Sequence, residues 1–383
     1  MRKLATVRLI KEVKPIGGAD NIELVLIDGW QCVAKKGEFK TGDKCIYFEI
    51  DSILPSHEVF NFMEKRKYRV KTIKLKKMLS QGLAMPLSII KEFGDPAPAS
   101  WKQIGADLTY LFGVKKHDPE GESEKRYPKV NRPWYHSIPV VRRLFKKTRG
   151  NFPTHITQKT DEERMQNLSD KSLEEFAKGR YVVTEKLDGT SATFIFRKRP
   201  WLSRWLLGDE FIVCSRNLTK VHKDDSFWWQ IANRDKIESQ MRDISELICK
   251  NGEYLIVQGE IIGPSIQGNK YKKNTLEFRL FNLKIHCEAN GTTKFNHYES
   301  QKILDQSNSS ISMVPVLFDS KEHMPWDDTL SFVERINYLA TCHTSKLNTK
   351  TIMEGVVVRS IDGKSSLESF KYINPNFLLK HGE

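Results

Sequence analysis

The chain has 383 residues, of which 39% are hydrophobic and 29% are charged, and its formal net charge is +14. This balance indicates a polyanionic partner, most commonly nucleic acid, although a basic protein without such a partner stays an alternative. No apolar run is long enough for a membrane span, no secretory signal is present, and the six cysteines are scattered without zinc-ligand spacing. We therefore expect a soluble intracellular protein, cytoplasmic or nuclear, that is monomeric and does not bind a membrane.

Residues 4–90 have the pattern of a small β-barrel. β-branched and aromatic runs alternate with the turn signals "GGADN", "DG" and "TGD". The predicted strands are Ala5–Ile10, Ile22–Asp28, Gln31–Lys35, Lys44–Ile50 and Val70–Leu75. Five short strands suit an OB-fold, and "KPIGGADNIELVLIDGWQCVAKKGEFKTGDKCIYFEID" resembles the tRNA-binding OB modules of synthetase-associated proteins. We predict an OB-fold nucleic-acid-binding domain at 1–100.

Residues 101–155 predict a basic linker, because they are rich in proline, glycine and charge. The run Arg142–Arg149 contains five basic residues, with Trp134, Tyr135 and Phe145 nearby. Basic residues interleaved with aromatic ones can follow a phosphate backbone. A solvated, charged helix face explains the same pattern equally well.

From residue 160 onward, helical and strand-like segments mix. The segment "KTDEERMQNLSDKSLEEFAKG" predicts a helix ending at Gly179, and "SFWWQIANRDKIESQMRDISELICKNG" predicts an amphipathic helix ending at Gly252. The runs "YLIVQGEIIG", "EFRLFNLKIH" and "MEGVVVRSI" predict strands. We therefore expect an α+β domain at 156–383.

Several of these strand-like runs contain a polar or aromatic residue that is a candidate for the functional site. A polar group inside an apolar strand is costly to bury alone, so it stands at a strand end or points into a cavity. The set comprises Lys186 and Asp188 in "EKLDG", Arg216 in "SRN", Glu260 in "VQGEIIG", Phe281 in "FRLFNLK", Glu354 in "MEGVVVR" and Lys371 in "ESFKYI".

In this order the motifs resemble those of the covalent nucleotidyltransferase superfamily of DNA ligases, RNA ligases and mRNA capping enzymes. K-x-D-G alone is a weak signal, whereas five or six collinear motifs are a strong one. The resemblance implies a ligase-type nucleotidyltransferase domain built on antiparallel sheets with flanking helices. It also implies that Lys186 attacks the α-phosphorus of a nucleotide and holds the product covalently.

Three features favour one branch of the superfamily. The position five residues after Lys186 is Ser191, where DNA ligases commonly have arginine. The sequence continues for only twelve residues past Lys371, and the OB-like module comes first. This arrangement, with "KTDEERMQN", "EKLDGTSA" and "SFKYINPNFLLK", resembles the RNA ligase 5 family.

That resemblance implies an ATP-dependent RNA ligase with AMP covalently bound to Lys186. The substrate implied is a nicked duplex, RNA or RNA/DNA hybrid, with RNA at the 3′-OH side. A DNA ligase or an mRNA guanylyltransferase would share the lysine chemistry, and a tRNA- or RNA-binding OB protein is the non-enzymatic alternative.

The resemblance assigns roles residue by residue. The catalytic set is Lys186, Glu260, Glu354 and Lys371. The nucleotide-binding set is Glu185, Lys186, Gly189, Arg216, Phe281, Val357 and Lys371, with Arg164 as a contact to the outgoing phosphates. Many relatives carry a second lysine two residues from Lys371, but here Ser369 and Ile373 flank it, so either Lys371 acts alone or Lys380 or another cation assists.

Elementary chemistry explains the carboxylates and the metal. Attack requires a neutral amine, whereas an unperturbed lysine has a pKa of about 10.4. Burial and nearby positive charge lower that pKa. The carboxylates Asp188, Glu260 and Glu354 would hold Mg²⁺ or Mn²⁺ through water, which suits a hard cation that keeps its hydration shell.

Overall fold

The computed structural model describes residues 2–94, 98–117, 150–199, 201, 204–205, 208–220, 226–322 and 329–381. The chain divides into two compact units. The N-terminal unit comprises Met1–Pro119, Arg164–Glu174 and Tyr372–Glu383, and the second unit comprises Glu120–Glu163 and Glu175–Lys371. The predicted basic run Arg142–Arg149 lies outside the described residues.

The N-terminal unit is an OB-fold built on a five-stranded antiparallel sheet of order β3-β2-β1-β4-β8. Its strands are β1 (Ala5–Pro15), β2 (Ile22–Ile27), β3 (Trp30–Lys35), β4 (Lys44–Phe48) and β8 (Leu83–Pro86). Strand β1 serves both halves of the sheet, because its residues 5–9 pair with β4 and its residues 10–15 pair with β2. A register shift between Ile10 and Glu12 separates the two pairings, and such an irregularity bends a strand so that a sheet can curl.

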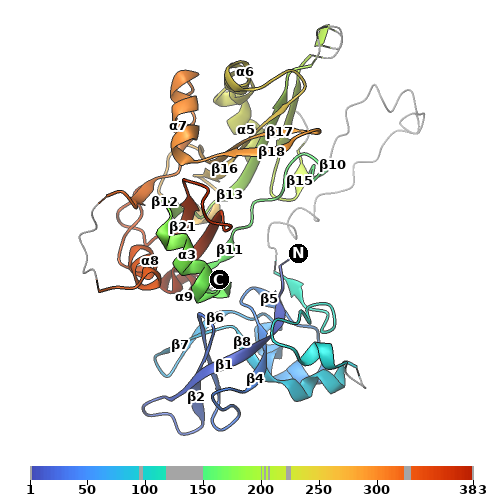
Figure 1. Cartoon of the computed structure of the whole chain (residues 1–383), viewed down its shortest axis with the longest axis vertical. Coiled ribbons are helices and arrows are strands. Elements are labelled where there is room, and N and C mark those ends of the chain that lie inside the picture. The colour runs from blue at the N-terminus through green and yellow to red at the C-terminus, as the bar shows by residue number, and fades with distance from the viewer. Residues whose placement is uncertain are drawn as a thin grey trace. The chain divides into compact units, whose positions relative to one another are not determined.

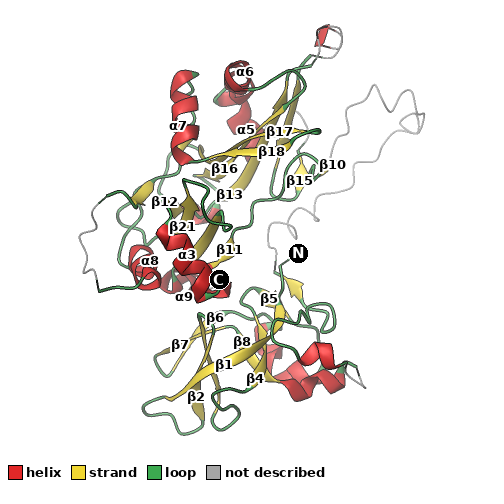
Figure 2. Ribbon diagram, in the orientation of Figure 1, coloured by secondary structure: helices red, strands yellow, loops and turns green. Residues whose placement is uncertain are grey.

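Short elements complete this unit (Figure 2). They are the strand pairs β5 (Ser52–Ile53) with β9 (Lys115–Lys116) and β6 (Thr72–Leu75) with β7 (Met78–Gln81), and the 3₁₀ helices η1 (Glu58–Arg66), η2 (Leu87–Glu92) and η3 (Ala99–Lys102). All five strands predicted for residues 4–90 are present, whereas β5, β7 and β8 were not predicted.

Two segments from beyond residue 160 also belong to the N-terminal unit, which the predicted boundaries of 1–100 and 156–383 did not include. Helix α9 (Pro375–His381) contributes Leu378 to the apolar core that contains Ile27 and Trp30. The Trp30 indole N–H donates to Asn167 Oδ1 at 2.8 Å, and the Asn167 amide donates to Glu49 Oε1 at 2.7 Å. Burial of apolar and polar groups therefore fixes both segments in this unit.

The second unit contains a large, mainly antiparallel sheet of order β10-β15-β14-β13-β16-β17-β18, with β19 parallel to β17. Its strands are β10 (Gly150–Asn151), β13 (Thr190–Arg197), β14 (Glu210–Cys214), β15 (Leu218–Thr219), β16 (Tyr254–Ile262), β17 (Glu277–Cys287), β18 (Gly291–Phe295) and β19 (Ser312–Met313). Helices α5 (Phe227–Arg234), α6 (Ile237–Ile248) and α7 (His297–Gln306) pack on one face of this sheet (Figure 1). Phe194, Trp229 and Ile244 lie in the core between them.

A smaller sheet of order β11-β22-β21-β12-β20 carries the K-x-D-G strand. Its strands are β11 (Glu163–Arg164), β12 (Tyr181–Lys186), β20 (Val316–Asp319), β21 (Gly355–Ser360) and β22 (Ser369–Ile373), and the neighbouring helices are α3 (Asp170–Lys178) and α8 (Phe332–Thr341). Edge-to-face aromatic contacts join these elements, with ring centroids 5.1 Å apart for Phe176 and Phe370 and 5.3 Å apart for Tyr181 and Phe332.

Two predicted helices differ from the structure. Only Asp170–Lys178 of the first is α-helical, because Glu163 and Arg164 form strand β11, which pairs with β22. The second is divided into α5 and α6 at Lys236, whose φ of 50° is incompatible with a continuous right-handed helix. Among the described residues, no helix has both the length and the apolar character needed to cross a bilayer.

Leu378→Ala tests whether α9 stabilises the N-terminal unit. We expect a loss of about 2–5 kcal/mol in unfolding free energy, because a buried leucine leaves a cavity in a packed core. Thermal and denaturant unfolding measure the effect, with the exposed Asn376→Ala as control. Equal stability of both variants would contradict a structural role for α9.

Candidate active site

Lys186 is the last residue of β12, where antiparallel pairing sets it opposite Gly355, the first residue of β21. Glu354 immediately precedes Gly355, so this register brings the carboxylate to the lysine. The Lys186 Nζ donates to Glu354 Oε1 at 2.6 Å, and both side chains are largely buried. Two motifs 168 positions apart in the sequence therefore meet at one point.

The glycine of K-x-D-G is required by packing. A Cβ on Gly189 would lie 2.3 Å from the Ile261 carbonyl oxygen and 2.8 Å from Glu260 Cγ. Any side chain at position 189 would push β13 away from β16. These two strands pair so that Ser191 of β13 lies opposite Glu260 of β16. Gly189 thus permits the close approach that brings Glu260 beside the nucleophile, and its predicted contact with the nucleotide stays a prediction.

The carboxylates determine the charge of Lys186 in this structure. Burial lowers the pKa of the Lys186 amine, but Glu354 and Glu260, with a smaller effect from Asp188, outweigh burial and raise that pKa above its usual value. The protein groups alone therefore keep Lys186 as an ammonium. Burial therefore acts in the expected direction but is outweighed by the close carboxylates, and the lowering expected from a divalent cation stays a prediction.

The same donors fit a hydrated divalent cation. Glu354, Glu260 and Asp188 all lie close enough to Lys186 to influence its pKa, and carboxylate oxygens are preferred by Mg²⁺ and Mn²⁺. Among the described residues, no three acidic, histidine or cysteine side chains are placed to bind a metal ion directly. A hydrated cation that contacts the carboxylates through water is compatible with this arrangement.

Asp188 is held by a loop that the motif analysis missed. Its backbone N–H donates to the Tyr271 hydroxyl at 2.8 Å, and its carboxylate pairs with Lys270. Burial, followed by the nearby carboxylates, raises the pKa of Tyr271, so the phenol stays neutral. The adjacent polar residues of "GNKYKKN" are the only sequence signal for this contact.

Lys371 on β22 is buried and pairs with Asp161, with 2.9 Å between Nζ and Oδ1. Arg216 approaches the other oxygen of Asp161, with 3.6 Å between its NH2 nitrogen and Oδ2. The structure therefore brings two members of the predicted nucleotide-binding set together around one carboxylate, which sequence reasoning did not single out. Arg216 is a cation near Lys371, whereas Lys380 lies on α9 in the N-terminal unit.

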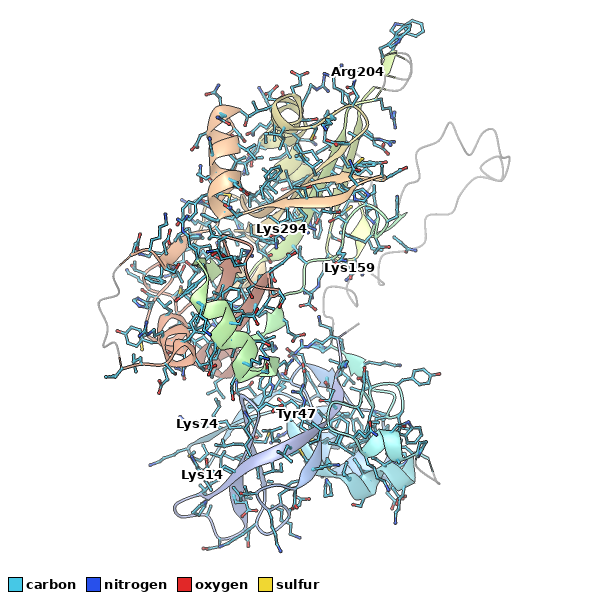
Figure 3. All side chains as sticks on the ribbon, in the orientation of Figure 1. Lys14, Tyr47, Lys74, Lys159, Arg204 and Lys294 are labelled. Carbon is cyan, nitrogen blue, oxygen red and sulfur yellow. The ribbon has the colours of Figure 1, made fainter. Side chains whose placement is uncertain are left out.

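A second group of cations surrounds the neighbouring Glu162. The Arg359 guanidinium is buried and lies 3.6 Å from Glu162 Oε1, and Ser369 donates to the same carboxylate. Lys284 on β17 pairs in register with Lys294 on β18, which Figure 3 labels. Burial, followed by the neighbouring Lys294, lowers the pKa of Lys284 to about 8.

The two residues predicted to stack on the purine, Val357 and Phe281, lie near Arg359. Val357 is buried opposite Thr184 on β12, and Arg359 donates to Thr184 Oγ1 at 2.7 Å. The Arg359 guanidinium carbon lies 5.8 Å from the centroid of the Phe281 ring, so Phe281 and Val357 both neighbour this arginine. Their roles in stacking a purine stay predictions.

Glu185 is 1% exposed, and its Oε2 accepts the Lys346 backbone N–H at 2.9 Å. Burial raises the pKa of Glu185, although hydrogen bonds from Ser345 and Lys346 oppose that rise. A buried carboxyl with a raised pKa suits hydrogen bonding to a neutral base.

Arg164 lies in the N-terminal unit. Its guanidinium is 3.1 Å from Asp51 Oδ2, and its central carbon is 5.8 Å from the centroid of a Trp30 ring. Burial lowers the pKa of Arg164, and Asp51 opposes that effect. These contacts give Arg164 a packing role, and its contact with outgoing phosphates stays a prediction.

Comparisons with known proteins agree with this geometry. A family model described as RNA ligase matches residues 179–373, and one described as an OB-fold domain matches residues 4–87. A solved Naegleria gruberi RNA ligase with PPi is 34% identical with a TM-score of 0.76, and the alignment covers 100% of this chain and 99% of that one. The chain belongs to the RNA ligase family.

Two further solved structures of Naegleria gruberi RNA ligase variants match similarly. One, with AMP and Mn, is 33% identical with a TM-score of 0.75 and covers 100% of this chain and 99% of that chain. Another, with ATP and Mn, is 33% identical with a TM-score of 0.75 and covers 99% of both chains. The comparison with curated proteins found no match. The resemblance to RNA ligases and the predicted fold class are thereby confirmed.

Glu354→Gln tests the electrostatics around Lys186. Because Glu354 is the strongest charged influence that raises the pKa of Lys186, its neutral analogue should lower that pKa. An NMR titration of the Lys186 side chain in chelator-containing buffer measures it. The matched control is Glu368→Gln, which removes an exposed carboxylate paired with Lys294. A Lys186 pKa that is unchanged by Glu354→Gln would contradict the assigned cause.

Proposed function

We propose that this ATP-dependent RNA ligase joins a 3′-OH end to a 5′-phosphate across a nick in a duplex, with RNA on the 3′-OH side, through AMP bound covalently to Lys186. The observation that carries the proposal is the gathering of Lys186, Glu354 and Glu260 at the junction of β12, β21 and β16. The pairing of Lys371 with Asp161 supports a second, phosphate-contacting role.

The reaction has three steps. The neutral amine of Lys186 attacks the α-phosphorus of ATP, a P–N bond forms, the bond to the bridging oxygen breaks and pyrophosphate leaves. The 5′-phosphate of the nick then displaces the lysine and becomes joined to AMP through an anhydride. Finally the 3′-OH attacks that 5′-phosphorus, a phosphodiester forms and AMP leaves.

The protein residues divide these tasks. Glu354 orients the Lys186 amine through their hydrogen bond. Lys371 and Arg216 would exchange Asp161 for phosphate oxygens and stabilise the charge in transfer. A divalent cation among Asp188, Glu260 and Glu354, when bound, would supply the positive charge that counters the carboxylates and favours the neutral amine.

The nucleotide contacts are proposed on the same basis. Phe281 and Val357 would enclose the purine, Glu185 would contact its edge, and Arg164 would meet the outgoing phosphates. The solved relatives are described with ATP, AMP, PPi and Mn, which supports ATP as the nucleotide and a divalent metal as the cofactor. The formal charge of +14 supports a nucleic-acid substrate.

Incubation with labelled ATP and Mg²⁺ or Mn²⁺ should place one AMP on Lys186. The bond should be acid-labile, because it is a phosphoramidate, and a chelator should abolish labelling. Peptide mapping by mass spectrometry locates the adduct, with parallel reactions in dATP and GTP to test the alternative activities. Undiminished labelling of Lys186→Ala, or an adduct on another lysine, would overturn the mechanism.

A sealing assay on four nicked duplexes, with RNA or DNA on each side of the break, tests the substrate. We expect efficient sealing only where the 3′-OH strand is RNA, because proteins recognise A-form geometry and 2′-hydroxyls. A pre-adenylylated nick supplied to Lys186→Ala checks the last step separately. Equal sealing of an all-DNA nick would favour a DNA ligase.

A further inference from the structure

The N-terminal unit contains a segment of the sequence that is rich in basic residues and has no acidic ones. Residues 65–91 include nine lysines and arginines and no aspartate or glutamate. The hairpin formed by β6 and β7, residues 72–81, lies at the centre of this segment and is called the basic hairpin below. Lys74, Lys76 and Lys77 are exposed, and none of them pairs with a carboxylate among the residues that the structure describes.

The base of the basic hairpin is fixed to the OB sheet. The Val33 N–H of β3 donates to Ser80 Oγ at 3.0 Å, and the Gln31 side chain donates to the Leu79 carbonyl at 2.9 Å. Ser80 and Gln81 are buried. The turn is at the opposite end, and Figure 3 shows Lys74 at the periphery of the N-terminal unit. The hairpin therefore presents its lysines from an ordered support.

The turn itself is unfavourable for lysine. Lys76 and Lys77 connect the paired residues Leu75 and Met78, and their φ angles are 45° and 69°. A two-residue turn with positive φ at both positions is type I′, for which Asn-Gly is strongly preferred. Two side chains with a Cβ are strained in this left-handed region, so the local backbone does not explain the choice of lysine.

We propose that the basic hairpin binds the phosphate backbone of the nucleic-acid substrate, with Lys76 and Lys77 as its principal contacts. This inference rests on the proposed function. The strained turn would be retained because it projects two ammonium groups from one point, and Lys74 adds a third on the preceding strand. Backbone contacts by lysine are independent of base sequence and weaken steeply with salt.

The variant Lys76→Asn/Lys77→Gly separates binding from folding, because it removes two charges and installs the preferred turn. We expect an unchanged or higher thermal midpoint together with weaker binding of a nicked duplex, by about tenfold at low salt. The slope of log affinity against log salt should become shallower by about two, since each phosphate contact contributes about 0.9. Fluorescence anisotropy of the full chain with a labelled nick across a salt series measures both.

The control is Lys35→Ala/Lys36→Ala, which removes two exposed lysines from the end of β3 in the same unit. It should leave the salt slope unchanged. The inference would be overturned if both variants lost nick affinity equally, or if the hairpin variant kept the full nick affinity of the wild type. Normal nick binding combined with lost adsorption to phosphatidylserine vesicles would also overturn it and assign the hairpin to a membrane surface.

Labelling with ATP on the same preparations distinguishes this inference from the function on which it rests. The hairpin variant should form the AMP adduct as fast as the wild type, because the lysine chemistry belongs to the second unit. If the wild type forms no adduct, the proposed function fails. If both proteins form it and bind nicks equally, only the hairpin inference fails.

Discussion

The hydrogen bond from Lys186 to Glu354 depends on the antiparallel register between β12 and β21. A slip of one residue would turn the Lys186 side chain to the other face of the sheet and away from Glu354. Gly189 then determines how closely the following strand approaches β16, and so where Glu260 lies. Two strand pairings thus place Glu354 and Glu260 beside the nucleophile, and strands hold such groups more precisely than loops do. A loop holds Asp188.

The cations proposed to meet the phosphates of the nucleotide already have partners of opposite charge within the protein. Lys371 and Arg216 share Asp161, and Arg164 contacts Asp51. Pairing reduces the large cost of burying these charges alone. When a nucleotide binds, these cations would exchange their carboxylate partners for phosphate oxygens. Such an exchange suits an enzyme that must bind, transfer and release phosphate groups in sequence.

The sequence pattern predicted those elements whose conformation depends mainly on neighbouring residues. Strands β1 to β4 of the OB-fold, the strands carrying Glu260 and Phe281, and the strand that begins directly after Glu354 follow from β-branched and aromatic runs between turn residues. The extended conformation at Arg164 did not follow, because it depends on pairing with β22 and on an ion pair with Asp51. In "KTDEERMQN" helix-compatible composition was outweighed by these distant partners.

In the candidate active site, too, the residues carried by motifs were predicted, whereas those placed by contacts between distant segments were not. Motif order predicted Lys186, Glu354 and Lys371, since their residue types are tied to the chemistry. It could not reveal Asp161, which is 210 positions from Lys371, nor Tyr271, which contacts the backbone of Asp188. Nor could it give the direction in which the protein groups alone shift the pKa of Lys186, because that direction depends on how closely the carboxylates approach.

The insertion of α9 into the N-terminal core has a consequence for biosynthesis. Synthesis proceeds from the N-terminus, yet this core lacks Leu378 until almost the whole sequence, the catalytic motifs included, has been translated. The barrel would leave the ribosome with part of its apolar surface uncovered, a condition that invites aggregation or chaperone binding. Completion of the first unit is thus postponed until the second has emerged.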